Sequence, residues 1–214
     1  MNASDPINPP LPPTIFVVDD DAVMCAMVRK LGETMGLAVA TYPSAEGFLK
    51  DFKNQPGCLV TDIHLNGMSG LELQQELLKR GATLPIIVIT GKGEVQMAVR
   101  AMQNQAVDFL EKPFDIAALG QRIRQAIDLD ADRRAKATQK SDAVERLSRL
   151  TPREREVMQF VVQGMSNKQM AAKLSLSEKT IEVHRGNVMR KTAADSVAEL
   201  VRLSLHSGET EKPA

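Results

Sequence analysis

Five polar residues, far apart along the chain, each follow a short apolar run, and their types suit phosphoryl chemistry. They are Asp19, Asp20, Asp62, Thr90 and Lys112. Carboxylates that lie together repel one another unless a divalent cation neutralises them, and Mg²⁺ prefers oxygen ligands. Asp62 stands alone after its run, so it is the best candidate for a nucleophile that forms an acyl phosphate. A Lys ammonium and a Thr hydroxyl are suited to bind phosphoryl oxygens.

The elements that must position these residues are short apolar runs that alternate with stretches of helical periodicity. The runs are Ile15–Val18, Ala38–Tyr42, Cys58–Thr61, Ile86–Thr90 and Ala106–Leu110. This alternation predicts five β-α units, with a parallel sheet covered by helices on both faces. In an open parallel sheet, ligands bind at the carboxyl ends of the strands. We therefore expect the five polar residues to converge on one pocket, and the last helix of this half to span Ile116–Leu129.

The residues after Leu150 carry no strand signal and repeat a pattern that starts helices. In Thr151–Glu154 a Thr N-cap is followed by Pro at the first helical position and by Glu three residues after the cap. Ser166–Gln169 and Ser196–Glu199 repeat this pattern. The segment 150–206 is therefore expected to form four short helices.

The third of these helices, Ser177–Lys191, has the composition of a helix that enters the major groove of DNA. Ile181 and Val188 are one heptad apart and are expected to face inward. The opposite face then carries Lys, Glu, Arg and Asn side chains, which can read base edges or bind phosphate. For such a helix alone a solvated surface is the favoured interpretation, so the order of the surrounding elements has to decide.

The charge of the chain also divides into two parts. Residues 1–130 hold 11 basic and 16 acidic residues, whereas residues 131–214 hold 16 basic and 11 acidic ones. A basic half suits a polyanionic partner. The apolar runs are much shorter than the roughly 20 residues of a membrane span, and residues 1–13 are rich in Pro without the features of a signal peptide. We therefore expect a cytoplasmic protein with a disordered tail over 1–13 and no membrane partner.

The first half resembles the receiver domain of two-component response regulators. The resemblance lies in the runs Val17–Asp21, Val60–Asp62, Gly67–Leu73, Ile89–Gly91 and Phe109–Phe114. It implies a flavodoxin-like, doubly wound α/β fold with strand order 2-1-3-4-5. It also implies that Asp62 accepts a phosphoryl group from a sensor histidine kinase.

The same resemblance implies roles for the other pocket residues. Mg²⁺ as cofactor would be held by Asp19, Asp20, Asp62 and the backbone carbonyl of His64; phosphate would be bound by Thr90, Gly91 and Lys112; and Thr90 and Phe109 would form the activation switch. A cis bond between Lys112 and Pro113 is also implied. Asn66 departs from the family pattern, which usually has Pro four residues after the acceptor. Because of this departure, the resemblance does not fix the lifetime of the phosphoryl group.

The second half resembles the LuxR-type helix-turn-helix of the FixJ/NarL group of response regulators. The resemblance lies in the runs Leu150–Val157, Gly164–Ala171, Leu176–Arg185 and Ala198–Val201. It implies that Ser177–Lys191 is the recognition helix and that Ser196–His206 helps the protein to dimerise. The residues expected to contact DNA are Lys168, Lys179, Thr180, Glu182, Val183, His184, Arg185, Asn187, Arg190 and Lys191.

Together these features predict a receiver over 14–128, a linker over 129–149 that is either helical or flexible, a helix-turn-helix domain over 150–206 and a tail over 207–214. The predicted function is a phosphorylation-dependent transcriptional regulator. Its expected partners are a sensor histidine kinase, promoter DNA, RNA polymerase and a second copy of the chain. No external substrate is expected, since the receiver catalyses only phosphoryl transfer to its own Asp62 and slow dephosphorylation.

Two alternative functions use the same residues. A phosphorylation-independent regulator would keep the receiver as an interaction module. A phosphatase similar to the haloacid dehalogenases would also combine a nucleophilic Asp with Thr and Lys. Such phosphatases need a second Asp two residues after the nucleophile, where this sequence has His64, so the regulator is favoured.

Overall fold

The computed structural model describes residues 11–91, 99, 101–103 and 106–208, so most of the predicted tail over 1–13 and the last six residues of the chain lie outside the described residues. The chain forms two compact units, Met1–Arg133 and Arg134–Ala214. The division falls inside the segment predicted as a linker. Each unit is described by itself.

The first unit contains a five-stranded parallel sheet with the order β2-β1-β3-β4-β5, which confirms the predicted fold. Its strands are β1 (Thr14–Val18), β2 (Ala38–Tyr42), β3 (Gly57–Asp62), β4 (Ile86–Thr90) and β5 (Asp108–Glu111). β5 begins two residues later than predicted, because the Ala106 N–H donates to the Ala101 carbonyl rather than to the sheet.

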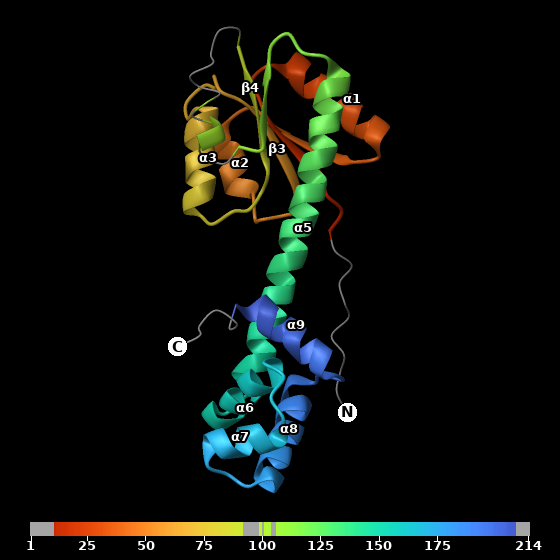
Figure 1. The fold of residues 1–214 in the computed structure, drawn as a ribbon. Helices are drawn as coiled ribbons and strands as arrows, with labels where there is room; N and C mark the ends of the chain where they lie inside the picture. The colour runs from red at the N-terminus through yellow and green to blue at the C-terminus, as the bar shows by residue number, and fades with distance from the viewer. Residues whose placement is uncertain (1–10, 92–98, 100, 104–105, 209–214) are drawn as a thin grey trace, which may run out of the picture. The chain divides into compact units, whose positions relative to one another are not determined.

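Helices cover both faces of this sheet (Figure 1). α1 (Ala22–Met35) and the first turns of α5 (Ile116–Ser148) pack on one face, and α2 (Ala45–Asp51) and α3 (Gly70–Lys79) pack on the other. Adjacent strand residues serve opposite faces, since Val17 packs in the cluster with α1 and α5 whereas Phe16 packs in the cluster with α2 and α3. Burial on both faces explains why the strands are apolar throughout.

The helix predicted over Ile116–Leu129 is longer than expected. α5 continues to Ser148, through a segment that contains no Pro or Gly to end it. Its last turns belong to the second unit, where Ala143 and Leu147 are buried in that unit's core. The end of the predicted linker is therefore part of the second domain's framework.

The second unit is otherwise built from four short helices, as predicted. They are α6 (Pro152–Val162), α7 (Asn167–Leu174), α8 (Glu178–Thr192) and α9 (Val197–Ser207). Capping boxes at Thr151 and Ser166 start α6 and α7. Ser196 caps α9 alone, because the Glu199 carboxylate accepts instead from the Asp195 N–H and from Arg146. Ile181 and Val188 are both buried in the core, as their heptad spacing predicts.

Candidate functional site

The polar residues predicted to converge do lie at one edge of the sheet. In the parallel register, Val18 pairs with Thr61, Asp62 with Ile89 and Thr90 with Glu111. Asp19, Asp62, Thr90 and Lys112 are therefore brought to the carboxyl ends of four adjacent strands. Asp19, Asp62 and Thr90 are buried there, so the edge forms a recessed polar site rather than a set of solvated loop ends.

Asp62 is held by two donors of different kinds. The Lys112 Nζ lies 2.5 Å from Asp62 Oδ2, and the His64 N–H donates to Asp62 Oδ1 at 2.9 Å. Lys112 Nζ also lies 3.8 Å from Asp19 Oδ2. Burial lowers the pKa of Lys112, but the hydrogen bond and charge of Asp62, together with the charge of Asp19, raise it overall. Lys112 is therefore a permanent cation between two carboxylates.

Asp19 is the least well satisfied carboxylate of this site. Its Oδ1 accepts from the Asp21 N–H at 2.8 Å, whereas its Oδ2 is buried and has no hydrogen-bond partner within the described residues. Burial raises the pKa of Asp19, against the lowering effects of the Asp21 N–H and Lys112. A cavity of about 320 Å³, lined in part by Asp19, Asp20 and Tyr42, opens beside it. A buried anionic oxygen of this kind is suited to a cation.

The loop after β3 is held in place on both sides of Asn66. Gly70, the first residue of α3, lies so close to the strand end that a Cβ on it would be 2.0 Å from the Asp62 carbonyl oxygen. Glu46 on α2 accepts from the Met68 N–H at 2.9 Å. On the N-terminal side of Asn66, the His64 N–H is bonded to Asp62 Oδ1. Between the His64 and Met68 anchors the Asn66 amide donates to Asp20 Oδ2 at 2.6 Å. The loop thus connects the proposed acceptor to the acidic pair.

The predicted switch residues lie on two neighbouring strands, Thr90 on β4 and Phe109 on the edge strand β5. Thr90 is buried at the end of β4, and its carbonyl accepts from the Lys112 N–H at 2.9 Å. Gly91 follows it, half-buried. The Phe109 ring on β5 is 40% exposed. The bond between Lys112 and Pro113 is cis, as the family resemblance implies.

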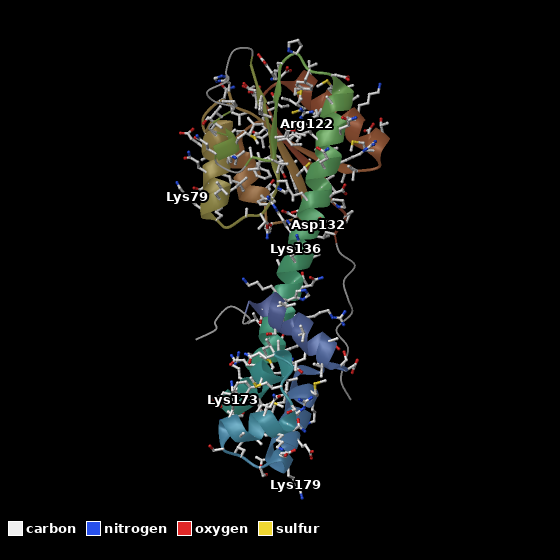
Figure 2. The ribbon with its side chains drawn as sticks, in the orientation of Figure 1. Lys79, Arg122, Asp132, Lys136, Lys173 and Lys179 are labelled. Carbon is white, nitrogen blue, oxygen red and sulfur yellow. The ribbon has the colours of Figure 1, made fainter. Side chains whose placement is uncertain are left out.

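Most residues predicted to contact DNA are accessible on α7 and α8. Exposed members are Lys168, Lys179, Glu182, Val183 and Arg190, and half-buried members are Thr180, His184, Arg185, Asn187 and Lys191. Figure 2 shows Lys179 projecting outward from α8. Val183, an apolar residue, is 59% exposed beside Glu182. The exposed face of α8 is therefore a mixture of polar and apolar side chains.

Lys191 differs from the other predicted DNA contacts, because its charge is already paired. Its Nζ lies 2.6 Å from Glu154 Oε2. The Lys191 hydrogen bond and the Thr151 N–H lower the pKa of Glu154 to about 2. Since the same carboxylate completes the capping box of α6, Glu154 joins the start of α6 to the end of the recognition helix.

Arg146 on α5 also binds the C-terminal end of α8. Its guanidinium donates to the Thr192 carbonyl at 2.6 Å and to the Ala193 carbonyl at 2.7 Å. It also pairs with Glu199 on α9 at 3.1 Å. These bonds satisfy carbonyl groups that a helix leaves free at its C-terminus, so one side chain joins three helices of the domain.

Comparison with known proteins supports the assignment of both units. Residues 15–124 match the response regulator receiver domain, and residues 148–204 match the luxR family of bacterial regulatory proteins. The transcriptional regulatory protein FixJ of Azorhizobium caulinodans is 43% identical over 195 residues, which cover 91% of this chain and 92% of FixJ. The chain belongs to the FixJ-type response regulators.

Other response regulators are also similar to this chain over most of its length. The response regulator protein TodT of Pseudomonas putida is 40% identical over 89% of this chain and 84% of TodT. The solved structure of the response regulator StyR has a TM-score of 0.81, is 41% identical and covers 91% of this chain and 98% of StyR. This response regulator therefore combines a receiver with a LuxR-type DNA-binding domain.

No helix in the described ranges is long and apolar enough to cross a membrane.

Sequence reasoning missed four residues that organise the two sites: Glu46, Asn66, Glu154 and Arg146. The sequence indicates Asn66 only as a departure from the family pattern. It indicates Glu154 only as part of the capping box that starts a helix. Their partners lie 22 to 53 residues away in the chain. The only sequence signal for Glu154 is its capping-box position, and that signal does not indicate the ion pair with Lys191.

Proposed function

We propose that this response regulator binds promoter DNA under the control of phosphorylation on Asp62. The observation that carries the proposal is the position of the Asp62 carboxylate at the end of β3, between the Lys112 ammonium and the His64 N–H. These donors orient the carboxylate, which is buried at the carboxyl end of the strand. The proposed phosphoryl donor is the phosphohistidine of a sensor kinase, and the cytoplasm is the compartment where kinase and DNA are both accessible.

The transfer can be described by the residues of the pocket. An Asp62 carboxylate oxygen attacks phosphorus, the P–N bond to the donor imidazole breaks, and its electron pair returns to the imidazole nitrogen. Lys112 is placed to pair with a phosphoryl oxygen, and the Thr90 hydroxyl and the Gly91 backbone lie beside the same strand end. No external substrate is turned over; the receiver acts only on its own Asp62 and, slowly, on its acyl phosphate.

The residues of the pocket fit Mg²⁺. The buried Asp19 Oδ2 lacks a hydrogen-bond partner among the residues described, Asp20 is exposed beside it, and Asp62 and the His64 carbonyl complete the proposed ligands. Among the described residues, no three His, Cys, Asp or Glu side chains are grouped closely enough to hold a metal ion by themselves. When bound, Mg²⁺ supplies positive charge next to the phosphoryl group.

The proposed DNA interface is the exposed face of α8 with the N-terminal end of α7. Glu182 is suited to accept from a cytosine amino group, and the neighbouring Val183 to contact a thymine methyl group. Lys168, Lys179 and Arg190 are suited to phosphates. Lys191 is better described as a positioning residue, because Glu154 neutralises it. A phosphorylated dimer would double these contacts on paired half-sites, and RNA polymerase is the proposed downstream partner.

The experiment is incorporation of phosphate from acetyl phosphate into the full chain. We expect Mg²⁺-dependent incorporation in the wild type, none in Asp62→Asn, and unchanged incorporation in Asp51→Asn, whose carboxylate lies on the exposed end of α2. No incorporation in the wild type, with DNA binding intact, would instead support the phosphorylation-independent regulator. Continuous release of phosphate would support the phosphatase.

A further inference from the structure

Two of the three carboxylates in the strand-end pocket, Asp62 and Asp20, are bonded to donors of the same chain. Asp62 is paired with Lys112 and with the His64 N–H. Asp20, which is exposed, accepts from the Asn66 amide at 2.6 Å. Only a nitrogen of that amide can donate to a carboxylate oxygen, so the orientation of the Asn66 side chain is set by its partner. A neutral amide therefore contacts the one exposed carboxylate of the proposed metal ligands.

The position of this amide is determined by the loop that carries it. On one side of Asn66, the His64 N–H is bonded to Asp62. On the other side, the Met68 N–H is bonded to Glu46 at 2.9 Å. The donor is thus presented to Asp20 from an anchored backbone, so little additional ordering is needed to make the bond. A Pro at this position, as is usual in the family, has no side-chain donor to offer.

We propose that Asn66 is a positioning residue that lowers the affinity of the receiver for Mg²⁺. Its amide donates to an oxygen of Asp20, and this hydrogen bond competes with a hydrated cation for the same carboxylate. The same bond holds Asp20 in the pocket when no metal is present. This inference rests on the metal site in the proposed function, and it makes the Mg²⁺ affinity of that site depend on a side chain that is not itself a proposed ligand.

The size of the effect follows from the kind of bond that is lost. A hydrogen bond to a charged group contributes modestly when both partners are exposed, so Asn66→Ala is expected to bind Mg²⁺ about three- to tenfold more tightly. Asn66 is exposed, so the substitution leaves the core intact. Metal-free melting temperatures of the two proteins are expected to agree closely.

The test is titration of the full chain with MgCl₂ alone, measured by calorimetry at constant ionic strength without a phosphoryl donor. Glu46→Ala is the matched control, because it releases the same loop at Met68 without removing the donor to Asp20. We expect tighter binding for Asn66→Ala and no comparable tightening for Glu46→Ala. The rise in melting temperature at a fixed Mg²⁺ concentration should also be larger in Asn66→Ala.

Three other results of the titration would contradict the inference, and each would contradict a different part of it. Equal or weaker Mg²⁺ binding by Asn66→Ala, when the wild type binds, would overturn the role of Asn66 and leave the metal site standing. Equal tightening by Glu46→Ala would assign the effect to loop anchoring rather than to the amide. Absence of Mg²⁺ binding in both the wild type and Asn66→Ala would overturn the metal site, and this inference with it.

Discussion

Asp19 in the receiver and Glu154 in the DNA-binding domain are both buried carboxylates, yet their surroundings shift their pKa values in opposite directions. Burial raises the pKa of Asp19, whose Oδ2 has no hydrogen-bond partner in the described part of the chain. The Lys191 hydrogen bond lowers the pKa of Glu154 to about 2. Groups kept incompletely satisfied are typical of functional sites, and fully paired ones of structural frameworks. The buried carboxylate of the receiver is thus left partly unsatisfied beside the proposed metal site, whereas that of the second domain is paired with Lys191 and holds the end of α8.

The largest difference in stability between the two domains is expected when one glycine in each domain is replaced by alanine. A Cβ at Gly70 would lie 2.0 Å from the Asp62 carbonyl oxygen, whereas a Cβ at Gly186 on α8 meets no described atom within 4 Å. Gly70→Ala should therefore destabilise the chain by about 3 kcal/mol or more and reduce phosphorylation. Gly186→Ala should stabilise it by about 0.5–1 kcal/mol. Urea unfolding measures both, and similar effects of the two would contradict the tight approach at Gly70.

The framework role of Glu154 predicts a smaller loss with a definite pH dependence. Glu154→Gln keeps the shape of the capping box but loses the charge partner of Lys191, at a cost of about 1–3 kcal/mol at neutral pH. Because the folded pKa of about 2 lies below the ordinary value of 4.5, this stability is present above pH 4.5 and is lost as the pH falls toward 2.

The control for this prediction is Glu156→Gln. Glu156 pairs with Arg153, but both side chains are more than a third exposed, so the change should be close to zero. Thermal unfolding of both variants between pH 7 and pH 3 measures the difference. A Glu154→Gln protein that loses as much stability on acidification as the wild type would contradict the role of this ion pair.

For Asp19 the pH dependence of stability is expected to be opposite to that for Glu154. This is the smallest of the three predicted effects on stability. Its folded pKa is raised above the ordinary value of 3.8, so ionised Asp19 reduces stability once the pH exceeds that value, increasingly until the raised folded pKa is passed. Asp19→Asn should therefore be at least as stable as the wild type at pH 7 in EDTA, while losing Mg²⁺ binding. A clear loss of stability in EDTA would show that Asp19 is a structural residue.

The parts of the molecule that could be predicted are those encoded by local patterns. Apolar runs ending in polar residues predicted the sheet and the convergence of Asp62 and Lys112, because parallel strands share one carboxyl edge. The capping box at Thr151 predicted the start of α6. The length of α5 could not be predicted, since a segment without Pro or Gly permits a helix but does not require one.

The contacts that could not be predicted are made by long side chains across the fold. Arg146 reaches the Thr192 carbonyl from 46 positions away, and Asn66 reaches Asp20 over the same separation. Such contacts depend on packing angles and rotamers that no local spacing encodes. The sequence indicated which residues carry charge, and the structure shows which of these charges are already paired.

The most direct test of phosphorylation control is the affinity of the full chain for DNA before and after phosphorylation. The probe is a duplex selected from a random pool by the acetyl-phosphate-treated wild type, with affinities measured at one fixed salt concentration. We predict that acetyl phosphate and Mg²⁺ tighten binding by about tenfold or more in the wild type and leave Asp62→Asn unchanged. An equal response of Asp62→Asn, or no response of a phosphorylated wild type, would contradict the central claim.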